Sequence, residues 1–153
     1  MDHMRVSAKA DYAVRAVIEI AVRHPDLVKA DDIATAQDIP IKFLENILSD
    51  LRKAGVVRSK RGAVGGYMLG YDANDISVAH VIRAVEGPIA WVRDERPGTV
   101  EYVGSAAGLE DVWIAVRASL RSVLDHVSIG QLVEHKPPKA VTRWTNDSQA
   151  WVD

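Results

Sequence analysis

The stretch from Pro40 to Tyr71 constrains the fold most, because a helical pattern passes directly into a glycine-rich hairpin pattern. Apolar residues recur there at a period of 3.6 while polar residues occupy the opposite face; the apolar set is Phe43, Leu44, Ile47, Leu48 and Leu51. Pro40 suits the first helical position, and Gly55 suits the residue just past the helix end. The sequence therefore predicts one amphipathic helix with both ends marked.

Two short strand-like runs follow this helix, at 56–60 and 66–69. Glycines between them permit positive φ and a close backbone approach. Four residues from 53 to 61 are cationic, namely Lys53, Arg58, Lys60 and Arg61. Positive charge beside the polar face of a helix suits a phosphate backbone, although such charges also serve simply to solvate small hairpins. A helix joined to such a hairpin is the layout of a winged helix-turn-helix.

Three separated sequence blocks, in this order, resemble the bacterial winged-helix regulators typified by IscR, NsrR and CymR. The blocks are MRVSAKADYAVRA, FLENILSDLRKAGVVRSKRGAVGGYMLG and ISVAHVIRAVEGPI. The resemblance spans residues 4–135, and the CymR-like branch, which is concerned with cysteine metabolism, looks nearest. It implies a homodimeric transcriptional regulator, a repressor, that binds a pseudo-palindromic operator in double-stranded DNA. It also implies a small metabolite or a biosynthetic enzyme as corepressor.

The same resemblance assigns the residues that read DNA. Lys42, Glu45 and Asn46 would face base edges in the major groove, where Asn pairs with adenine and Glu accepts from cytosine. Arg61 would enter the minor groove. The phosphate contacts and wing positions complete the DNA-binding set: Ser7, Lys9, Tyr12, Arg58, Lys60, Gly65 and Gly66.

The remaining pattern predicts a mainly α fold in which the hairpin is the only sheet. We expect a buried scaffold helix at 8–23, a short helix at 30–37 and, after the wing, a helix at 78–85 with Ser77 as its N-cap. Asp38 stands where relatives often have glycine, and it tolerates the left-handed conformation. Glycines and prolines predict a loop at 87–108. The expected divisions are 4–73 for DNA binding, 74–108 for regulation, 109–135 for dimerisation and 136–153 for a tail.

A long amphipathic helix is predicted at 109–127. Its apolar side consists of Val112, Trp113, Val116, Leu120, Val123, Leu124 and Val127. A small domain cannot easily hide so long a stripe, so we expect a partner helix across a twofold axis; packing on its own domain alone is the alternative. A short helix at 128–135 and a tail follow. Trp144 and Trp151 in the tail are seven residues apart and could share one helical face.

The chain contains no cysteine, which excludes disulfides, thiolate zinc sites and cysteine nucleophiles. Relatives that bind iron–sulfur clusters carry three cysteines in the segment corresponding to 88–107. This chain has Ile89, Ala90, Trp91 and Val92 there. We therefore expect no cofactor, and no metal site, since the five histidines lack ligand spacing. Trp91 could instead line an effector pocket or could simply pack. No catalytic set is recognisable, so we do not expect an enzyme.

Charge adds modest support for a nucleic-acid partner. Residues 5–71 hold 11 Lys+Arg against 8 Asp+Glu, a surplus of +3, whereas residues 72–153 hold 8 against 12, a balance of −4. No signal peptide or membrane-length apolar run is visible, so we expect a cytoplasmic protein with no membrane partner, whose natural start is Met4. The alternative function is a protein-interaction module whose winged-helix domain no longer binds DNA.

Overall fold

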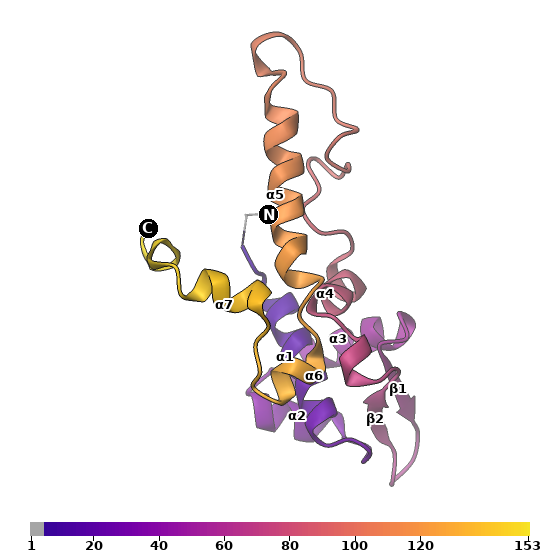
Figure 1. Cartoon of the computed structure of the whole chain (residues 1–153). Helices are drawn as coiled ribbons and strands as arrows, with labels where there is room; N and C mark the ends of the chain where they lie inside the picture. Colours follow the sequence, from indigo (N-terminus) through magenta and orange to yellow (C-terminus); the bar gives the residue numbers. More distant parts are fainter. Residues whose placement is uncertain (1–4) are drawn as a thin grey trace.

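The computed structural model describes residues 5–153 and shows a mainly helical chain with one small antiparallel sheet (Figure 1). The elements are α1 (Ala8–Val22), α2 (Ala30–Gln37), α3 (Ile41–Lys53), β1 (Val57–Lys60), β2 (Gly66–Leu69), α4 (Val78–Glu86), α5 (Leu109–Leu124), α6 (Ile129–Val133) and α7 (Lys139–Thr145). Short 3-10 helices lie at Ala73–Asp75, Gly104–Ala106 and Ser148–Trp151. The predicted winged helix-turn-helix fold is confirmed. The expected start at Met4 lies outside the described residues.

Helix α1 is the centre of the hydrophobic core. Its residues Ala13, Ala16 and Val17 are completely buried, and the helix packs against α2, α3, α4, α6 and β2. Small side chains let these neighbours approach closely, which is how one helix can contact so many elements. The core also includes Ile76 and Ile129, so it continues across the expected boundaries at 73 and 108.

Helices α2 and α3 form the helix-turn-helix. Asp38 ends α2 in the left-handed conformation with φ 50°, as predicted, and Ile39 is buried in the turn. Pro40 is the N-cap of α3 and not its first residue, because its carbonyl oxygen already accepts the Leu44 amide at 2.9 Å. This shift by one residue is a small correction to the predicted helix start.

The apolar face of α3 is buried except at its margin. The buried set is Leu44, Ile47, Leu48 and Leu51. Phe43 was predicted to belong to this face but is 44% exposed, because at 100° per residue it lies roughly 90° from the centre of the stripe. Its ring instead meets Tyr12 of α1 edge-on, with centroids 5.6 Å apart.

The wing consists of β1 and β2, paired from Val57 opposite Leu69 to Lys60 opposite Gly66. A third segment pairs with β2 through one residue. Val28, which precedes α2, exchanges both backbone hydrogen bonds with Tyr67, at 2.9 and 2.7 Å. This pairing fixes the wing against the helix-turn-helix, so the hairpin does not stand as an isolated two-stranded unit, which would be marginally stable.

Helix α4 begins where predicted, because the Ser77 hydroxyl accepts the His80 amide at 3.0 Å. The segment 87–108 is a loop, as expected, apart from its one 3-10 turn. Within it, Val92 and Glu95 exchange backbone hydrogen bonds at 2.8 and 2.9 Å. Arg93 and Asp94 between them both take positive φ, which closes a tight hairpin turn.

Helix α5 extends away from the body of the molecule (Figure 1), and none of its 16 residues is buried. The prediction that it reaches Val127 was wrong. The helix ends at Leu124, and the chain turns so that Val127 enters the core, with 5% of its surface exposed. There the Val127 carbonyl accepts the Val78 amide at 2.9 Å. Val127 could not make this hydrogen bond if α5 continued through it.

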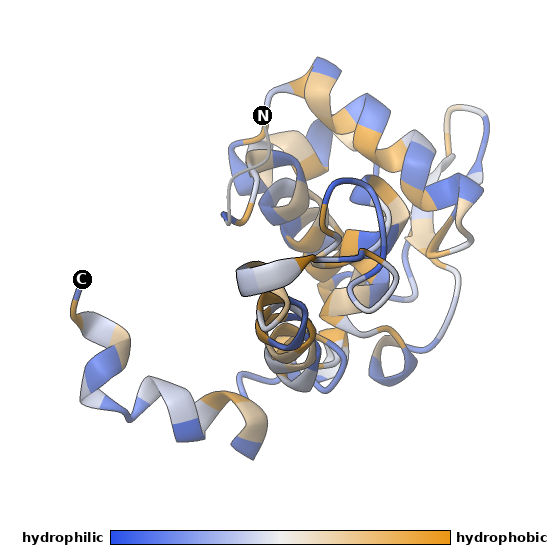
Figure 2. Ribbon diagram, turned by 90° about the horizontal axis from the view of Figure 1, so that it is seen from above, coloured by the Kyte–Doolittle hydropathy of each residue, from blue (hydrophilic) through white to orange (hydrophobic). Residues whose placement is uncertain are grey.

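The tail after Lys136 projects from the rest of the chain (Figures 1 and 2). Trp144 and Trp151 could have shared one helical face, but they lie in two separate helical segments. Helix α7 ends at Thr145, and the Asp147 carboxylate accepts the Gln149 amide at 2.9 Å to start a separate 3-10 turn. The two indoles remain 49% and 78% exposed.

Candidate nucleic-acid interface

The polar face of α3 is exposed, and the structure brings the three predicted base-reading residues together on it. Lys42, Glu45 and Asn46 follow the i, i+3, i+4 spacing of one helical face. None of the three forms an ion pair or side-chain hydrogen bond with another residue in 5–153. Their donors and acceptors are therefore free to meet base edges.

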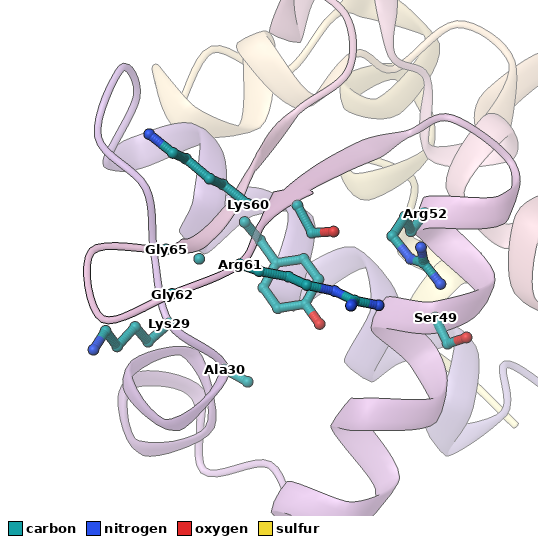
Figure 3. A pocket seen from close by; sticks show the side chains of 11 residues that line it. Lys29, Ala30, Ser49, Arg52, Lys60, Arg61, Gly62 and Gly65 are labelled. Carbon is teal, nitrogen blue, oxygen red and sulfur yellow. The ribbon is translucent and has the colours of Figure 1, made fainter.

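A groove of about 420 Å³ runs between the wing and the two helices of the helix-turn-helix (Figure 3). The wing contributes Lys60 and Arg61, the segment before α2 contributes Lys29, and the last turns of α3 contribute Ser49 and Arg52. Figure 3 shows Arg61 directed across the groove toward α3, whereas Lys60 points outward. The groove thus joins the wing and α3 into one continuous surface.

The electrostatics of this groove suit a polyanion. Four cationic residues line it, and no aspartate or glutamate among residues 5–153 does. Lysine and arginine side chains gathered in this way neutralise phosphates and release counterions. Sequence reasoning missed two of the four, Lys29 and Arg52. Arg52 was detectable, because it lies three residues after Ser49 on the polar face; Lys29 was not, because only the folded chain brings it to the wing.

A second hollow, of about 500 Å³, also borders β1 and is lined by Arg58 together with Gly55, Tyr71 and Arg52. Arg52 therefore stands between the two hollows and borders both. The predicted phosphate contacts at Arg58 and Lys60 thus border different hollows, with Arg58 in the second and Lys60 in the first.

The wing glycines shape the hairpin. A Cβ on Gly65 would lie 2.1 Å from the Lys60 carbonyl oxygen, and one on Gly66 would lie 2.8 Å from the Val28 carbonyl oxygen. Gly66 also has φ 152°, a conformation that favours glycine. Gly65 is buried inside the turn. Direct DNA contact by Gly65 and Gly66 remains a prediction.

Ser7, Lys9 and Tyr12 do not line the groove. Ser7 caps α1 by accepting the Ala10 amide at 3.0 Å and donates its hydroxyl to the Glu86 carboxylate. The Lys9 ammonium lies 3.0 Å from the Asp50 carboxylate on α3. These three residues hold α1 against its neighbours and remain half-exposed, so their predicted phosphate contacts remain predictions.

The predicted dimerisation stripe lies along α5. Val112 and Leu120 are 50% and 42% exposed, and the other members, Trp113, Val116, Val123 and Leu124, are only half-buried. Trp91 is 46% exposed in the loop. Its predicted role in effector binding remains a prediction. No helix among the described residues is long and apolar enough to cross a membrane.

Comparison with known proteins identifies a family. The family model described as Rrf2, an iron-dependent transcriptional regulator, matches residues 6–135. Rv1287 of Mycobacterium tuberculosis H37Rv, named as a candidate HTH-type transcriptional regulator, is 45% identical over 148 residues, covering 96% of this chain and 92% of Rv1287. CymR of Bacillus subtilis, an HTH-type transcriptional regulator, is 35% identical over 138 residues, covering 86% and 91%. These relatives are regulators and not enzymes.

Solved structures agree with this assignment. CymR, described as the global cysteine regulator of B. subtilis, superposes with a TM-score of 0.71 at 32% identity and covers 87% of this chain and 98% of CymR. IscR of T. potens also gives 0.71 at 32% identity, covering 86% of this chain and 88% of IscR. The resemblance seen in the sequence blocks is confirmed.

The residues of this chain do not fit the iron that the family description implies. Thiolates are the usual protein ligands of iron–sulfur clusters, and the chain has no cysteine. Within residues 5–153, no three histidine, aspartate or glutamate side chains gather closely enough to hold a metal ion. The donor set for a family-type cluster is therefore absent from the sequence itself.

Proposed function

Because this chain belongs to the Rrf2 family of DNA-binding, winged-helix transcriptional regulators, we propose that it is a homodimeric repressor of a pseudo-palindromic operator. The observation that carries the proposal is the groove between the wing and α3, which four cationic residues and no acidic one among residues 5–153 line. An operator of two half-sites matches a protein with twofold symmetry.

In this proposal α3 enters the major groove, and Lys42, Glu45 and Asn46 read base edges. Arginine and lysine contacts to phosphates position a protein on DNA, whereas base-edge contacts supply sequence specificity. Lys29 and Arg52 beside the groove act in the first way. Arg61 at the wing enters the minor groove, where a narrow A·T-rich segment attracts arginine.

Homodimerisation is supported by α5. A helix of 16 residues with no buried side chain gains little from its own domain, and its apolar stripe needs a partner surface. A second copy of α5 across a twofold axis would supply one, with the stripe from Val112 to Leu124 self-complementary. Two DNA-reading units would then be held at a fixed spacing.

The most specific part of the proposal concerns the process that the protein regulates. CymR is described as a cysteine regulator, so we extend regulation of sulfur or cysteine metabolism to this chain as an analogy. A small metabolite or a biosynthetic enzyme would be the corepressor, with Trp91 of the loop as its proposed contact. A corepressor must bind the DNA-competent dimer more tightly than the incompetent one, otherwise it shifts no equilibrium.

Selection of genomic fragments that bind the protein tests the proposal, followed by a salt titration of binding to the recovered operator and to random duplex. We expect steep salt dependence on both. Asn46→Ala should cost about 1–3 kcal/mol on the operator and little on random DNA.

Arg61→Ala should weaken operator binding as well, whereas Arg143→Ala, which removes an exposed arginine of α7, serves as the matched control and should bind normally. Salt-independent binding to both duplexes, or no recovered operator, would favour the protein-interaction module instead.

A further inference from the structure

A third hollow lies against α5, far along the chain from the wing. Its volume is about 370 Å³. Ile114 and Ala118 of α5 and Pro97 of the loop form its apolar part, while Arg117, Arg121 and Ser122 contribute polar groups. The loop closes on α5 here, since a Cβ added at Gly98 would lie 3.8 Å from the Ile114 Cδ1 atom.

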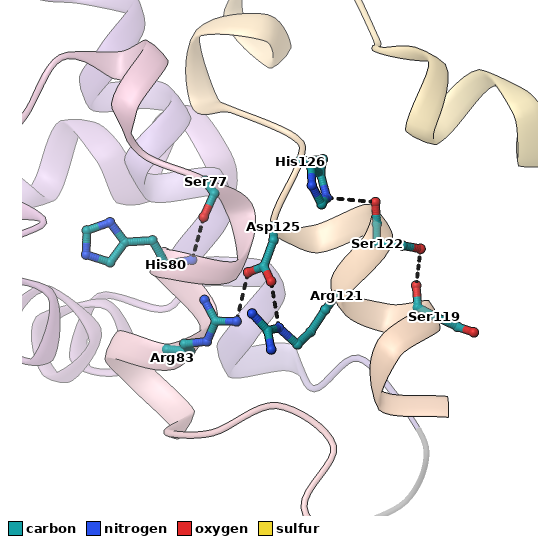
Figure 4. Close-up of polar contacts among 8 residues, drawn as sticks. All are labelled: Ser77, His80, Arg83, Ser119, Arg121, Ser122, Asp125 and His126. Atoms are coloured by element: carbon teal, nitrogen blue, oxygen red, sulfur yellow. Dashed lines mark hydrogen bonds and ion pairs between the residues drawn. The ribbon is translucent and has the colours of Figure 1, made fainter. Parts of the chain in front are cut away.

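The hollow carries excess positive charge. Asp125 at its edge accepts from Arg121 Nε at 2.7 Å through one carboxylate oxygen and from Arg83 Nη2 at 2.8 Å through the other (Figure 4). Burial alone raises the pKa of Asp125, but the hydrogen bonds and charges of the two arginines outweigh it and leave this pKa below its ordinary value of 3.8. Each oxygen of this carboxylate thus accepts from one arginine, and neither of these two arginines is Arg117.

Arg117 has an unpaired hydrogen-bond donor at this site. Its Nε atom is buried without a hydrogen-bond partner, and its guanidinium forms no ion pair within residues 5–153. A guanidinium offers five N–H donors and cannot shed its charge at physiological pH. The charge of Arg117 thus has no counter-charge among residues 5–153, and an oxyanion in the hollow would supply one.

We propose that this hollow binds a small organic carboxylate through Arg117. The planar fork of the guanidinium matches the two oxygens of a carboxylate, and the apolar lining suits a short carbon skeleton. The volume falls within the range of small-molecule sites.

Most of the hollow and the proposed dimer stripe lie on different faces of α5, and Arg117 lies at the border between them, about 20° from Leu124 around the helix. They share no residue: one uses Ile114, Arg117 and Arg121, and the other uses Val116, Leu120 and Leu124. At 100° per residue, Ile114 lies about 120° from Leu120 around the helix. The inference deepens the proposed function, since an effector matters only if the chain regulates DNA; its test contains no DNA, so each idea can fail separately.

Isothermal titration of the full chain with pyruvate tests the site. We expect binding with a dissociation constant on the order of 1 mM or tighter. Pyruvamide, the neutral amide of similar shape, should bind at least about tenfold more weakly, as expected when a charge-assisted hydrogen bond is lost. Inorganic phosphate should also bind more weakly than pyruvate, because it makes no use of the apolar lining.

Variants locate the binding. Arg117→Gln should lose about tenfold in pyruvate affinity, Arg117→Lys should lose less because it keeps the charge but not the planar fork, and Arg143→Gln in the tail should bind like the wild type. Circular dichroism checks that each variant folds. The proposal is overturned if pyruvate shows no binding up to about 20 mM, if phosphate binds equally well, or if both Arg117 variants bind pyruvate like the wild type.

Discussion

Charge placed on the stripe of α5 should dissociate the proposed dimer, and the structure sets the size of the effect. Leu120 is 42% exposed. Full burial of a leucine side chain is worth about 1.5–3 kcal/mol. Covering the exposed part of Leu120 in a dimer would therefore contribute about 1 kcal/mol to the free energy of association. Because a twofold dimer contains the residue twice, Leu120→Glu forfeits about 2 kcal/mol of apolar burial.

The new carboxylates add a second and larger cost. Each would be removed from water among the apolar side chains of the stripe, which costs about a further 1–3 kcal/mol. We therefore expect a total loss of at least about 4 kcal/mol, or roughly a thousandfold increase in the dissociation constant of the dimer. Operator binding should fall with it, since both half-sites must be engaged at once.

Ile114 provides a matched control on the same helix. It is 41% exposed but lies on the other face, beside Arg117. Ile114→Glu adds the same charge at nearly the same exposure, and we expect it to leave association unchanged. Sedimentation velocity of both variants over a concentration series measures the effect. A Leu120→Glu dimer of wild-type affinity, or dissociation by Ile114→Glu alone, would refute the assignment of the interface.

Three other predictions address the wing, the groove and the α4–α5 contact. Arg52→Ala should weaken binding to all duplexes alike and lower the slope of log affinity against log salt by about 1, in a salt titration. Gly65→Ala should distort the wing, because the new Cβ meets the Lys60 carbonyl at 2.1 Å, and a binding assay should show lost operator affinity with an unchanged helical circular dichroism spectrum. Asp125→Asn should lower the free energy of unfolding at pH 7. The folded-state pKa of Asp125 is depressed, so its stabilisation is present above about pH 3.8 and disappears as pH falls below it; denaturant titrations should show the two proteins converging in acid.

The parts of the fold that were predictable are those determined by residues close together in the sequence. The period of α3, the positive φ of Gly55 after it and the Ser77 cap of α4 each depend on residues within one or two helical turns. Local signals of this kind fix where an element begins and which face it buries. They also placed Lys42 and Asn46 on one exposed face.

The parts that were not predictable depend on contacts between distant residues. Nothing near Val28 indicates that it will pair with Tyr67, yet that pairing brings Lys29 to the wing and completes the basic groove. The end of α5 is similar. Apolar periodicity continues to Val127, but contacts with α4 decide where the helix stops.

The contacts of Asp125 give the molecule a physical connection from the α5 hollow to the DNA-reading surface. Arg121 lines the hollow and holds one oxygen of Asp125, while Arg83 of α4 holds the other. Helix α4 in turn packs against both α1 and α3. An anion that attracts Arg121 competes with Asp125 for the same guanidinium and so loosens the joint between α5 and α4. Such a ligand shifts DNA affinity only to the extent that this joint differs between the DNA-bound and free states of the protein. The difference in the joint between the two states also decides whether the anion strengthens or weakens DNA binding, whereas the affinity of the ligand alone does not.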